Sequence, residues 1–268
     1  MIKYIFSDLD GTLLSSDKTI SYKNKEIIKK ANDNGVKFIV NSGRLPYSFR
    51  SYKKDFDLNY FVSGNGSLIK WNGKIVYSKP LSCEDAKRIA EVAYKYEAYA
   101  RCFSLKKICL FKFDTKTAKG VVNKPYGFFD KKTVNNLEEM FKFIDNHDIY
   151  KIGFFDDHEK LERVKKDVDS ELKNVNTSYS TVRFLENHDI NTSKGNAIKE
   201  VCKLFNIDYD EVLVIGDNGN DMSMIDNVFH SACPANATDE VKCKCEYISN
   251  RSCDEDAIFD IVSKFCNL

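Results

Sequence analysis

The chain has 268 residues, enough for one large domain or two modest ones. Forty-one basic side chains against 40 acidic ones leave a formal charge of +1, so no global field favours nucleic acid or an anionic membrane. No apolar run approaches the ~18 residues of a membrane-spanning helix, and Asp8 comes too early for a signal-peptide core. The nine cysteines are an odd and scattered number, which argues against a disulfide framework. We therefore expect a cytoplasmic protein, a monomer or small homo-oligomer, without nucleic-acid or membrane partners.

Short apolar runs alternate with a helical pattern in the first 80 residues. Strands are predicted, in chain order, at 2–6, 36–40, 60–62, 68–71 and 74–77. The helix between the first two strands is capped by Ser21 and closed by Gly35. This alternation of strands and helices predicts a parallel sheet with right-handed crossovers. Asn72-Gly73 predicts a two-residue hairpin between the last two strands.

The middle of the chain has a different pattern. Helices are predicted near 82–96, 133–146 and 157–173, and strands near 98–104, 108–113, 150–155 and 178–190. This order predicts an α+β module with its helices on one side of a sheet. After residue 189 the alternation of strands and helices returns. Helices are predicted at 194–205, 221–226 and 254–266, and a strand at 212–215. The predicted fold class is α/β: a Rossmann-like doubly wound parallel-sheet core, residues 1–80 and 189–268, with an inserted α+β domain, residues 81–188.

Two carboxylates follow the first strand, at the edge where open α/β sheets place their active sites. Asp8 and Asp10 are two positions apart, so both side chains can point to one side of an extended chain. One could attack a substrate while the other handles a proton. Gly11 lets the backbone turn and expose its amides to an anion. Taken alone, the same residues would also suit an ordinary turn.

Two further groups suit an anionic ligand. Ser42-Gly43-Arg44 follows the second strand and offers a hydroxyl, a backbone amide and a guanidinium to a phosphate. Lys194 lies at a predicted helix start, where the helix dipole disfavours a cation, so a functional task is favoured. Each group alone is also typical of a turn or of a solvated surface residue.

The loop after the strand at 212–215 is rich in oxygen ligands. It reads Gly216-Asp217-Asn218-Gly219-Asn220-Asp221. Hard Mg²⁺ prefers carboxylate and amide oxygens, and the twelve-residue pattern of a helix-loop-helix Ca²⁺ site is missing. The loop therefore predicts a Mg²⁺ site.

Together these groups resemble the motifs of the haloacid dehalogenase-like hydrolase superfamily, and within it the Cof-type phosphatases with a large cap domain. The matching segments are Asp8-Leu9-Asp10-Gly11-Thr12, Ser42-Gly43-Arg44, Lys194-Gly195 and Gly216–Asp221, supported by Gly64-Asn65-Gly66-Ser67 and Pro234-Ala235-Asn236-Ala237. The resemblance covers the whole chain, although the cap matches only in the order of its elements. Ser42 stands where threonine is commoner, and Ser67 replaces an alanine.

The resemblance implies a Mg²⁺-dependent phosphatase that hydrolyses small phosphorylated metabolites through an aspartyl-phosphate. It implies that Asp8 is the nucleophile and Asp10 the general acid and base. Mg²⁺ would be bound by Asp8, the backbone carbonyl of Asp10 and Asp217, with Asp221 a direct or more distant ligand. Ser42 and Lys194 would bind the phosphoryl oxygens, and Lys194 would keep Asp8 ionised. The other residues implied to bind phosphate or substrate are Gly43, Arg44, Asn65 and Asn220.

The resemblance also implies that the inserted domain closes over the site and selects the substrate. Arg101, Lys112 and Arg183 are candidate contacts for the leaving group, and sugar phosphates, nucleotides and phosphorylated cofactors all stay open. Two other functions also stay open. One is a phosphomutase that returns the phosphoryl group to its substrate. The other is a non-catalytic protein that binds a phosphorylated ligand.

Overall fold

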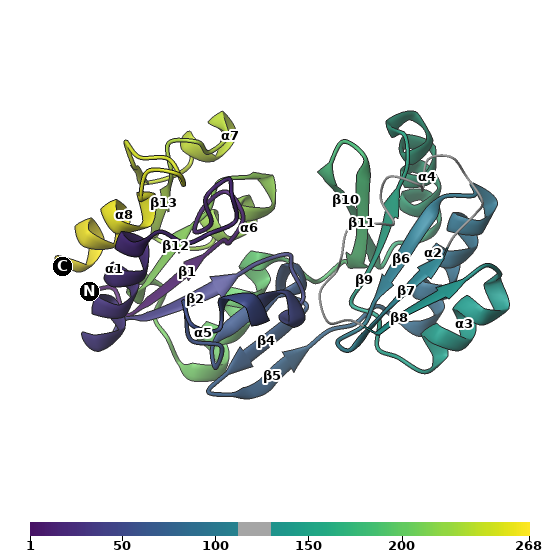
Figure 1. Ribbon diagram of the computed structural model, residues 1–268, viewed down its shortest axis with the longest axis horizontal. Coiled ribbons are helices and arrows are strands. Elements are labelled where there is room, and N and C mark those ends of the chain that lie inside the picture. Colours follow the sequence, from purple (N-terminus) through teal and green to yellow (C-terminus); the bar gives the residue numbers. More distant parts are fainter. Residues whose placement is uncertain (112–129) are drawn as a thin grey trace. The chain divides into compact units, whose positions relative to one another are not determined.

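The computed structural model describes residues 1–111 and 130–268, which form two compact units (Figure 1). The first unit comprises Met1–Ser78 and Thr192–Leu268, and the second comprises Lys79–Asn191. Among the described residues, no helix combines the length and the apolar character that crossing a membrane requires.

An eight-stranded sheet forms the centre of the first unit, in the spatial order β14-β13-β12-β1-β2-β3-β4-β5. The strands are β1 (Tyr4–Ser7), β2 (Lys37–Asn41), β3 (Phe61–Ser63), β4 (Leu68–Trp71), β5 (Lys74–Ser78), β12 (Val212–Ile215), β13 (His230–Cys233) and β14 (Tyr247–Ile248). Neighbouring strands from β14 to β3 are parallel, whereas β4 and β5 add an antiparallel hairpin. Asn72 and Gly73 both have positive φ at its turn, as a two-residue hairpin requires. The predicted parallel sheet and hairpin are therefore confirmed.

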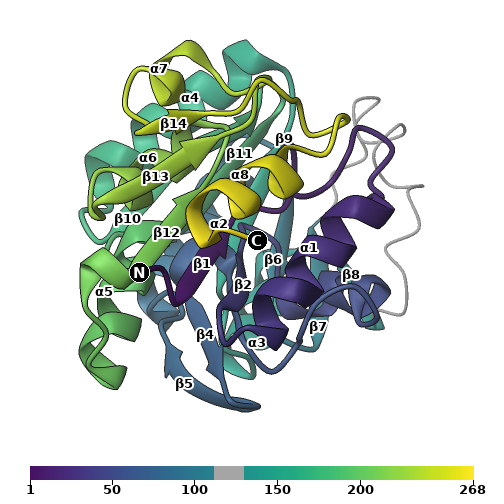
Figure 2. The same cartoon turned by 90° about the vertical axis from the view of Figure 1, so that its left-hand side faces the viewer.

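Helices cover both faces of this sheet. They are α1 (Tyr22–Asp33), α5 (Lys194–Phe205), α6 (Met222–Ile225), α7 (Asp239–Lys242) and α8 (Ala257–Cys266), with 3₁₀ turns at 46–52, 64–66, 209–211 and 219–221. α1 and α8 lie side by side (Figure 2). α5 and α6 pack with alternate residues of β1, β2 and β12 in one apolar cluster. Ser21 caps α1 by accepting from the Asn24 amide, and Gly35 follows the helix with φ +84°, as predicted.

The second unit has a six-stranded sheet in the order β10-β11-β9-β6-β7-β8. Its strands are β6 (Tyr99–Phe103), β7 (Lys107–Phe111), β8 (Asp130–Val134), β9 (Lys151–Phe155), β10 (Val175–Thr181) and β11 (Phe184–Asp189). All neighbours are antiparallel except β7 and β8. The prediction of one strand over 178–190 is wrong, because the chain turns at Val182 and Arg183. Neither residue is of a type that marks turns, so the sequence gives no signal there.

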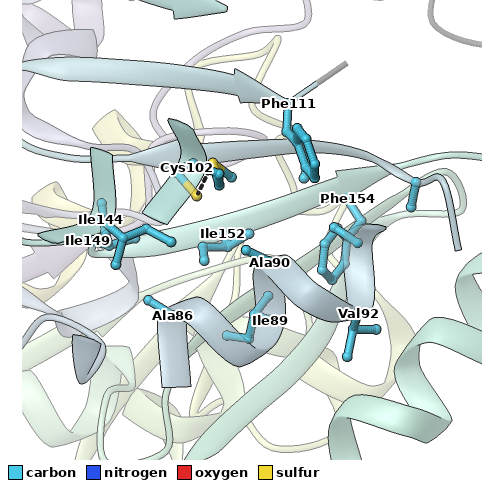
Figure 3. Packing of buried hydrophobic residues seen from close by; sticks show 14 of the residues in the cluster. Ala86, Ile89, Ala90, Val92, Cys102, Phe111, Ile144, Ile149, Ile152 and Phe154 are labelled. Carbon is cyan, nitrogen blue, oxygen red and sulfur yellow. Dashed lines mark hydrogen bonds between the residues drawn. The ribbon is translucent and has the colours of Figure 1, made fainter. Parts of the chain in front are cut away.

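Three helices pack on one face of this second sheet: α2 (Cys83–Lys95), α3 (Leu137–Asp145) and α4 (His158–Glu171). Figure 3 shows apolar residues of α2, among them Ile89 and Ala90, against Ile152 and Phe154 of β9. The predicted helix at 133–146 begins later, at Leu137, because Asn136 caps it and residues 133 and 134 belong to β8. The α/β fold class with an α+β second module is confirmed. Lys112, a predicted substrate contact, lies outside the described residues.

Candidate active site

The carboxyl ends of β1, β2 and β12 lie together because these strands are parallel neighbours. Ser7 pairs in register with Val40 on one side and with Ile215 on the other. The Asp8 amide then donates to the Ile215 carbonyl at 2.8 Å, which continues the ladder one residue past β1. The segments that follow the three strands therefore meet at one edge of the sheet.

Lys194 joins two of these segments through a buried ion-pair network. Its Nζ lies 2.6 Å from Oδ1 of Asp8 and 2.5 Å from Oδ1 of Asp221. The Lys194 side chain is fully buried, and so is that of Asp221. Burial lowers the pKa of an amine, but the charges of Asp221 and Asp8 outweigh it and raise the pKa of Lys194 above its ordinary value. Lys194 is therefore a fixed cation at this edge.

The start of α5 is held in place by contacts on both sides of Lys194. Ser193 caps the helix by accepting from the Asn196 amide, and Asn41 donates to the Lys194 carbonyl at 3.1 Å. A Cβ on Gly195 would lie 1.8 Å from the Ser223 carbonyl oxygen, so only glycine lets the helix approach this closely. These contacts direct Lys194 towards Asp8.

Asp8 is an unusual carboxylate because it is buried among other acids. Burial raises its pKa to about 8, the charges of Asp221 and Asp217 act in the same direction, and Lys194 opposes them. A further nearby cation would therefore favour the ionised form of Asp8.

One oxygen from each of Asp8, Asp217 and Asp221 lies within 4.8 Å of the other two. Burial raises the pKa of Asp217 to about 6, although its Oδ1 accepts from the Thr12 hydroxyl at 2.6 Å. Three crowded carboxylates are the donor set of a hard divalent cation, so the residues present fit such an ion. Oδ2 of Asp221 already accepts from the amides of Asp217 and Asn218, at 2.9 and 3.1 Å. These amides and Lys194 leave Asp221 less available as a ligand than Asp8 and Asp217.

Asp10 lies in a separate cluster at the exposed side of the same loop. Arg44 donates two hydrogen bonds of 2.6 Å to Asp10, from Nε to Oδ2 and from Nη2 to Oδ1. Lys18 adds a third bond from Nζ to Oδ1 at 2.9 Å. Burial would raise the pKa of Asp10, but the hydrogen bonds from Arg44 and Lys18 outweigh it and hold the pKa below its ordinary value. Arg44, predicted to contact the substrate, is thus bonded to Asp10 in this structure.

The other predicted anion-binding residues form one loop cluster. Ser42 is buried, its carbonyl accepts from the Asn65 amide at 3.1 Å, and its hydroxyl accepts from the Arg44 amide at 3.2 Å. Asn65 is left-handed, with φ +53°, and its side-chain oxygen accepts from Asn220 at 3.3 Å. A Cβ on Gly43 would lie 2.8 Å from that oxygen. The structure thus brings Ser42, Gly43, Asn65 and Asn220 together.

Three residues without a predicted role also take part in the site. Thr12 orients Asp217, Asn236 donates to the Gly11 carbonyl at 2.8 Å, and Lys18 contacts Asp10. Thr12 and Asn236 stand inside recognised motifs, so the motifs gave a signal for them. Lys18 stands in a charged turn eight residues after Asp10, and nothing in the sequence distinguishes it from a solvated surface lysine.

A doubly wound sheet with a buried carboxylate and lysine network at its carboxyl edge has the architecture of an α/β enzyme. The chain belongs to the haloacid dehalogenase-like hydrolase family, whose model matches residues 5–262. The prediction of this family, and of an enzyme, from the four motifs is therefore confirmed.

Curated relatives match nearly the full chain. A 5-amino-6-(5-phospho-D-ribitylamino)uracil phosphatase of Bacillus subtilis is 28% identical over 96% of both chains. A phosphoglycolate phosphatase of Thermoplasma volcanium is 28% identical over 99% of both. Among solved structures, a haloacid dehalogenase-like hydrolase from Bacteroides thetaiotaomicron superposes with a TM-score of 0.85, at 23% identity, over 99% of this chain and 100% of its own. This structural similarity shows that the chain and the Bacteroides thetaiotaomicron protein share a fold.

Proposed function

We propose that this chain is a Mg²⁺-dependent phosphatase that hydrolyses small phosphorylated metabolites through an aspartyl-phosphate on Asp8. The observation that carries the proposal is the 2.6 Å contact between Lys194 and Asp8, next to Asp217 and Asp221. A buried carboxylate beside a fixed cation is suited to act as a nucleophile towards an electron-poor centre.

In the first step, a carboxylate oxygen of Asp8 forms a bond to phosphorus while the bond to the leaving oxygen breaks. Asp10 gives a proton to that leaving oxygen. Arg44 and Lys18 must first release the Asp10 carboxyl group, because their hydrogen bonds hold its pKa below the ordinary value. In the second step, Asp10 takes a proton from the water that attacks phosphorus, and the carboxylate of Asp8 is released. Lys194 and the loop with Ser42, Gly43 and Asn65 supply cationic and hydrogen-bonding groups for the phosphoryl oxygens.

Mg²⁺ would be held by Asp8, Asp217 and the backbone carbonyl of Asp10, with Asp221 orienting the loop through the bonds described above. When bound, the ion supplies positive charge against the repulsion between the carboxylate and the phosphate dianion. The donor set supports this assignment because all its atoms are oxygens, which Mg²⁺ prefers.

The substrate class is proposed from the relatives. One is named for a phosphorylated ribitylaminopyrimidine and another for phosphoglycolate, both small phosphate monoesters. Sugar phosphates and phosphorylated cofactors are therefore the first compounds to assay.

The experiment measures phosphate release from an aryl phosphate and from a panel of small phosphate monoesters, with Mg²⁺ and with a chelator. We expect turnover with Mg²⁺, none with the chelator, and none in Asp8→Asn at either condition. Release that persists in a folded Asp8→Asn variant would refute Asp8 as the nucleophile. Isomerised sugar phosphate without free phosphate would instead identify a phosphomutase.

A further inference from the structure

The first turn of α5 is hydrogen-bonded to a residue of a second helix. The first amides of a helix have no partner inside it and need one from elsewhere. Ser193, the N-cap, accepts from the Asn196 amide at 3.0 Å and so satisfies one of them. The amide of Gly195, a buried residue, donates instead to the Ser223 hydroxyl of α6 at 3.1 Å. Ser223 therefore caps α5 from another part of the chain.

Ser223 belongs to the same short segment as Asp221, which contacts Lys194 directly. Asp221 accepts from Nζ of Lys194 at 2.5 Å, and two residues later Ser223 accepts from the amide that follows Lys194 in the chain. The segment thus contacts Lys194 at the tip of its side chain and next to its backbone. A lysine stem is a flexible chain of four carbons, so the place of Nζ depends on where the backbone is held.

Two asparagines hold Ser223 and its helix in place. Nδ2 of Asn227 donates to the Ser223 carbonyl at 2.5 Å, which fixes the end of α6. Nδ2 of Asn41, at the end of β2, donates to the Lys194 carbonyl at 3.1 Å and lies 3.8 Å from Sδ of Met224 on α6. Ser223 is therefore held by its own helix and, through Met224, by a neighbouring strand of the sheet.

We propose that Ser223 is a positioning residue, which holds the Gly195 amide and thereby keeps Lys194 directed at Asp8. This inference rests on the proposed phosphatase function, in which Lys194 contacts the phosphoryl group. The start of a helix is an unfavourable place for a cation, because the exposed amides there carry positive partial charge. The Lys194 side chain is also fully buried. A shift of the helix start would relieve both effects, and the hydrogen bond from Gly195 to Ser223 opposes that shift.

The proposal predicts a loss of kcat that does not depend on the leaving group, because Lys194 contacts Asp8 and the phosphoryl group. Ser223→Ala should lower kcat by about 10-fold on both an aryl and an alkyl phosphate, within the ~10²-fold that a misplacement of about 1 Å can cost. Ser223→Thr keeps the hydroxyl and should keep most of the activity. Ser223→Val has the shape of threonine without its oxygen and should resemble Ser223→Ala, so this pair separates the hydrogen bond from packing.

The matched control is Ser21→Ala. The Ser21 hydroxyl accepts from the Asn24 amide at the start of α1, at the same distance of 3.1 Å and in a similarly half-buried place. Loss of either hydroxyl leaves a helix amide without its partner, so both variants should be less stable than wild type. Because α1 carries none of the candidate site residues, Ser21→Ala should leave kcat unchanged.

The second measurement needs no turnover and no metal. Each protein is treated in a chelator with an amine-acylating reagent, and the modification of Lys194 is followed by peptide mass spectrometry. Ser223→Ala and Ser223→Val should expose Lys194 and label it about 5-fold faster or more, whereas Ser223→Thr and Ser21→Ala should label it like wild type. Equal labelling in all proteins, equal kcat in the threonine and valine variants, or an equal loss of kcat in Ser21→Ala would each overturn the role of Ser223. If wild type releases no phosphate from any substrate, the proposed function fails, and the labelling still decides whether Ser223 positions Lys194.

Discussion

The Nζ atom of Lys194 lies 2.6 Å from Oδ1 of Asp8, although the two residues are 186 positions apart in the chain. The same atom donates to Asp221 at 2.5 Å, so one buried cation serves two buried carboxylates. When all three acids are ionised, Lys194 balances one of their negative charges and two remain, one of them on Asp217. The first two predictions below follow from this excess of negative charge.

Asp8→Asn should stabilise the metal-free protein while abolishing turnover. The pKa of Asp8 is raised from 3.8 to about 8 in the folded state, so the folded protein binds a proton that the unfolded chain has lost. The penalty for ionising Asp8 therefore grows as pH rises from about 4 and is complete above about 8. Removing the charge should raise the free energy of unfolding by on the order of 1 kcal/mol or more, and more at pH 9 than at pH 6. Denaturant unfolding in a chelator at both pH values measures this.

Asp221→Asn, in contrast to Asp8→Asn, should lower the free energy of unfolding. Asp221 accepts from two backbone amides as well as from Lys194, so its oxygens are all used. An amide nitrogen facing Lys194 or a backbone N–H would leave a buried donor without an acceptor, at a cost of roughly 1–3 kcal/mol. A stability gain in Asp221→Asn, or a loss in Asp8→Asn, would contradict this account of the network.

Mg²⁺ should raise the thermal midpoint of the wild type. The ion binds the crowded carboxylates of the folded state and not the unfolded chain, so the midpoint should rise with its concentration. Asp217→Asn removes one ligand and should shift the concentration dependence upwards by at least tenfold. Asp239→Asn, on the surface at the start of α7, is the matched control and should behave like the wild type. A midpoint independent of Mg²⁺ would exclude the proposed metal site.

Gly195→Ala should lower both stability and activity. Its Cβ would lie 1.8 Å from the Ser223 carbonyl oxygen, a backbone atom that has little room to shift. The start of α5 should move, carrying Lys194 away from Asp8, and such overpacking costs about 1–3 kcal/mol. Gly219→Ala, in the loop of residues 216–221, is the control, because nothing lies within 4 Å of the added Cβ. Circular-dichroism melts and kcat for both variants test this, and equal behaviour of the two would contradict it.

His188 on β11 should make stability depend on pH below 6.5. Burial lowers the pKa of this imidazole in the folded protein, and the charge of Lys151 acts in the same direction. Below pH 6.5 the unfolded chain gains a proton that the folded protein does not, so stability falls as pH falls, by at most about 1.4 kcal/mol per pH unit. His188→Gln should flatten this slope relative to wild type. Identical slopes in wild type and His188→Gln would refute the prediction.

The elements that carry the motifs were predictable because their signals are local. Buried strands such as Val212–Ile215 are continuous apolar runs, and the polar loop directly after each run marks the edge of the sheet. The family followed from the order of four such loops. The turn at Val182 and Arg183 was missed because its residues lack the turn chemistry that glycine, proline or asparagine would provide.

Contacts between distant segments were not predictable. The hydrogen bond from Thr12 to Asp217 joins residues 205 positions apart, and the sequence of neither segment indicates that they are in contact. The attachment of Arg44 to Asp10 depends likewise on the tertiary arrangement of two loops. The residue types of the candidate site could therefore be predicted from the sequence. The sequence could not predict that Asp8 and Asp10 belong to two separate networks of hydrogen bonds.

The most direct measurement is the detection of a phosphorylated Asp8. A reaction with ³²P-labelled substrate and Mg²⁺ is quenched in acid after milliseconds, and the protein is digested and mapped by mass spectrometry. The account predicts label on the peptide that contains Asp8, lost on chase with unlabelled substrate and absent in Asp8→Asn. Turnover at the same rate without any labelled protein, or with the label on another residue, would contradict it.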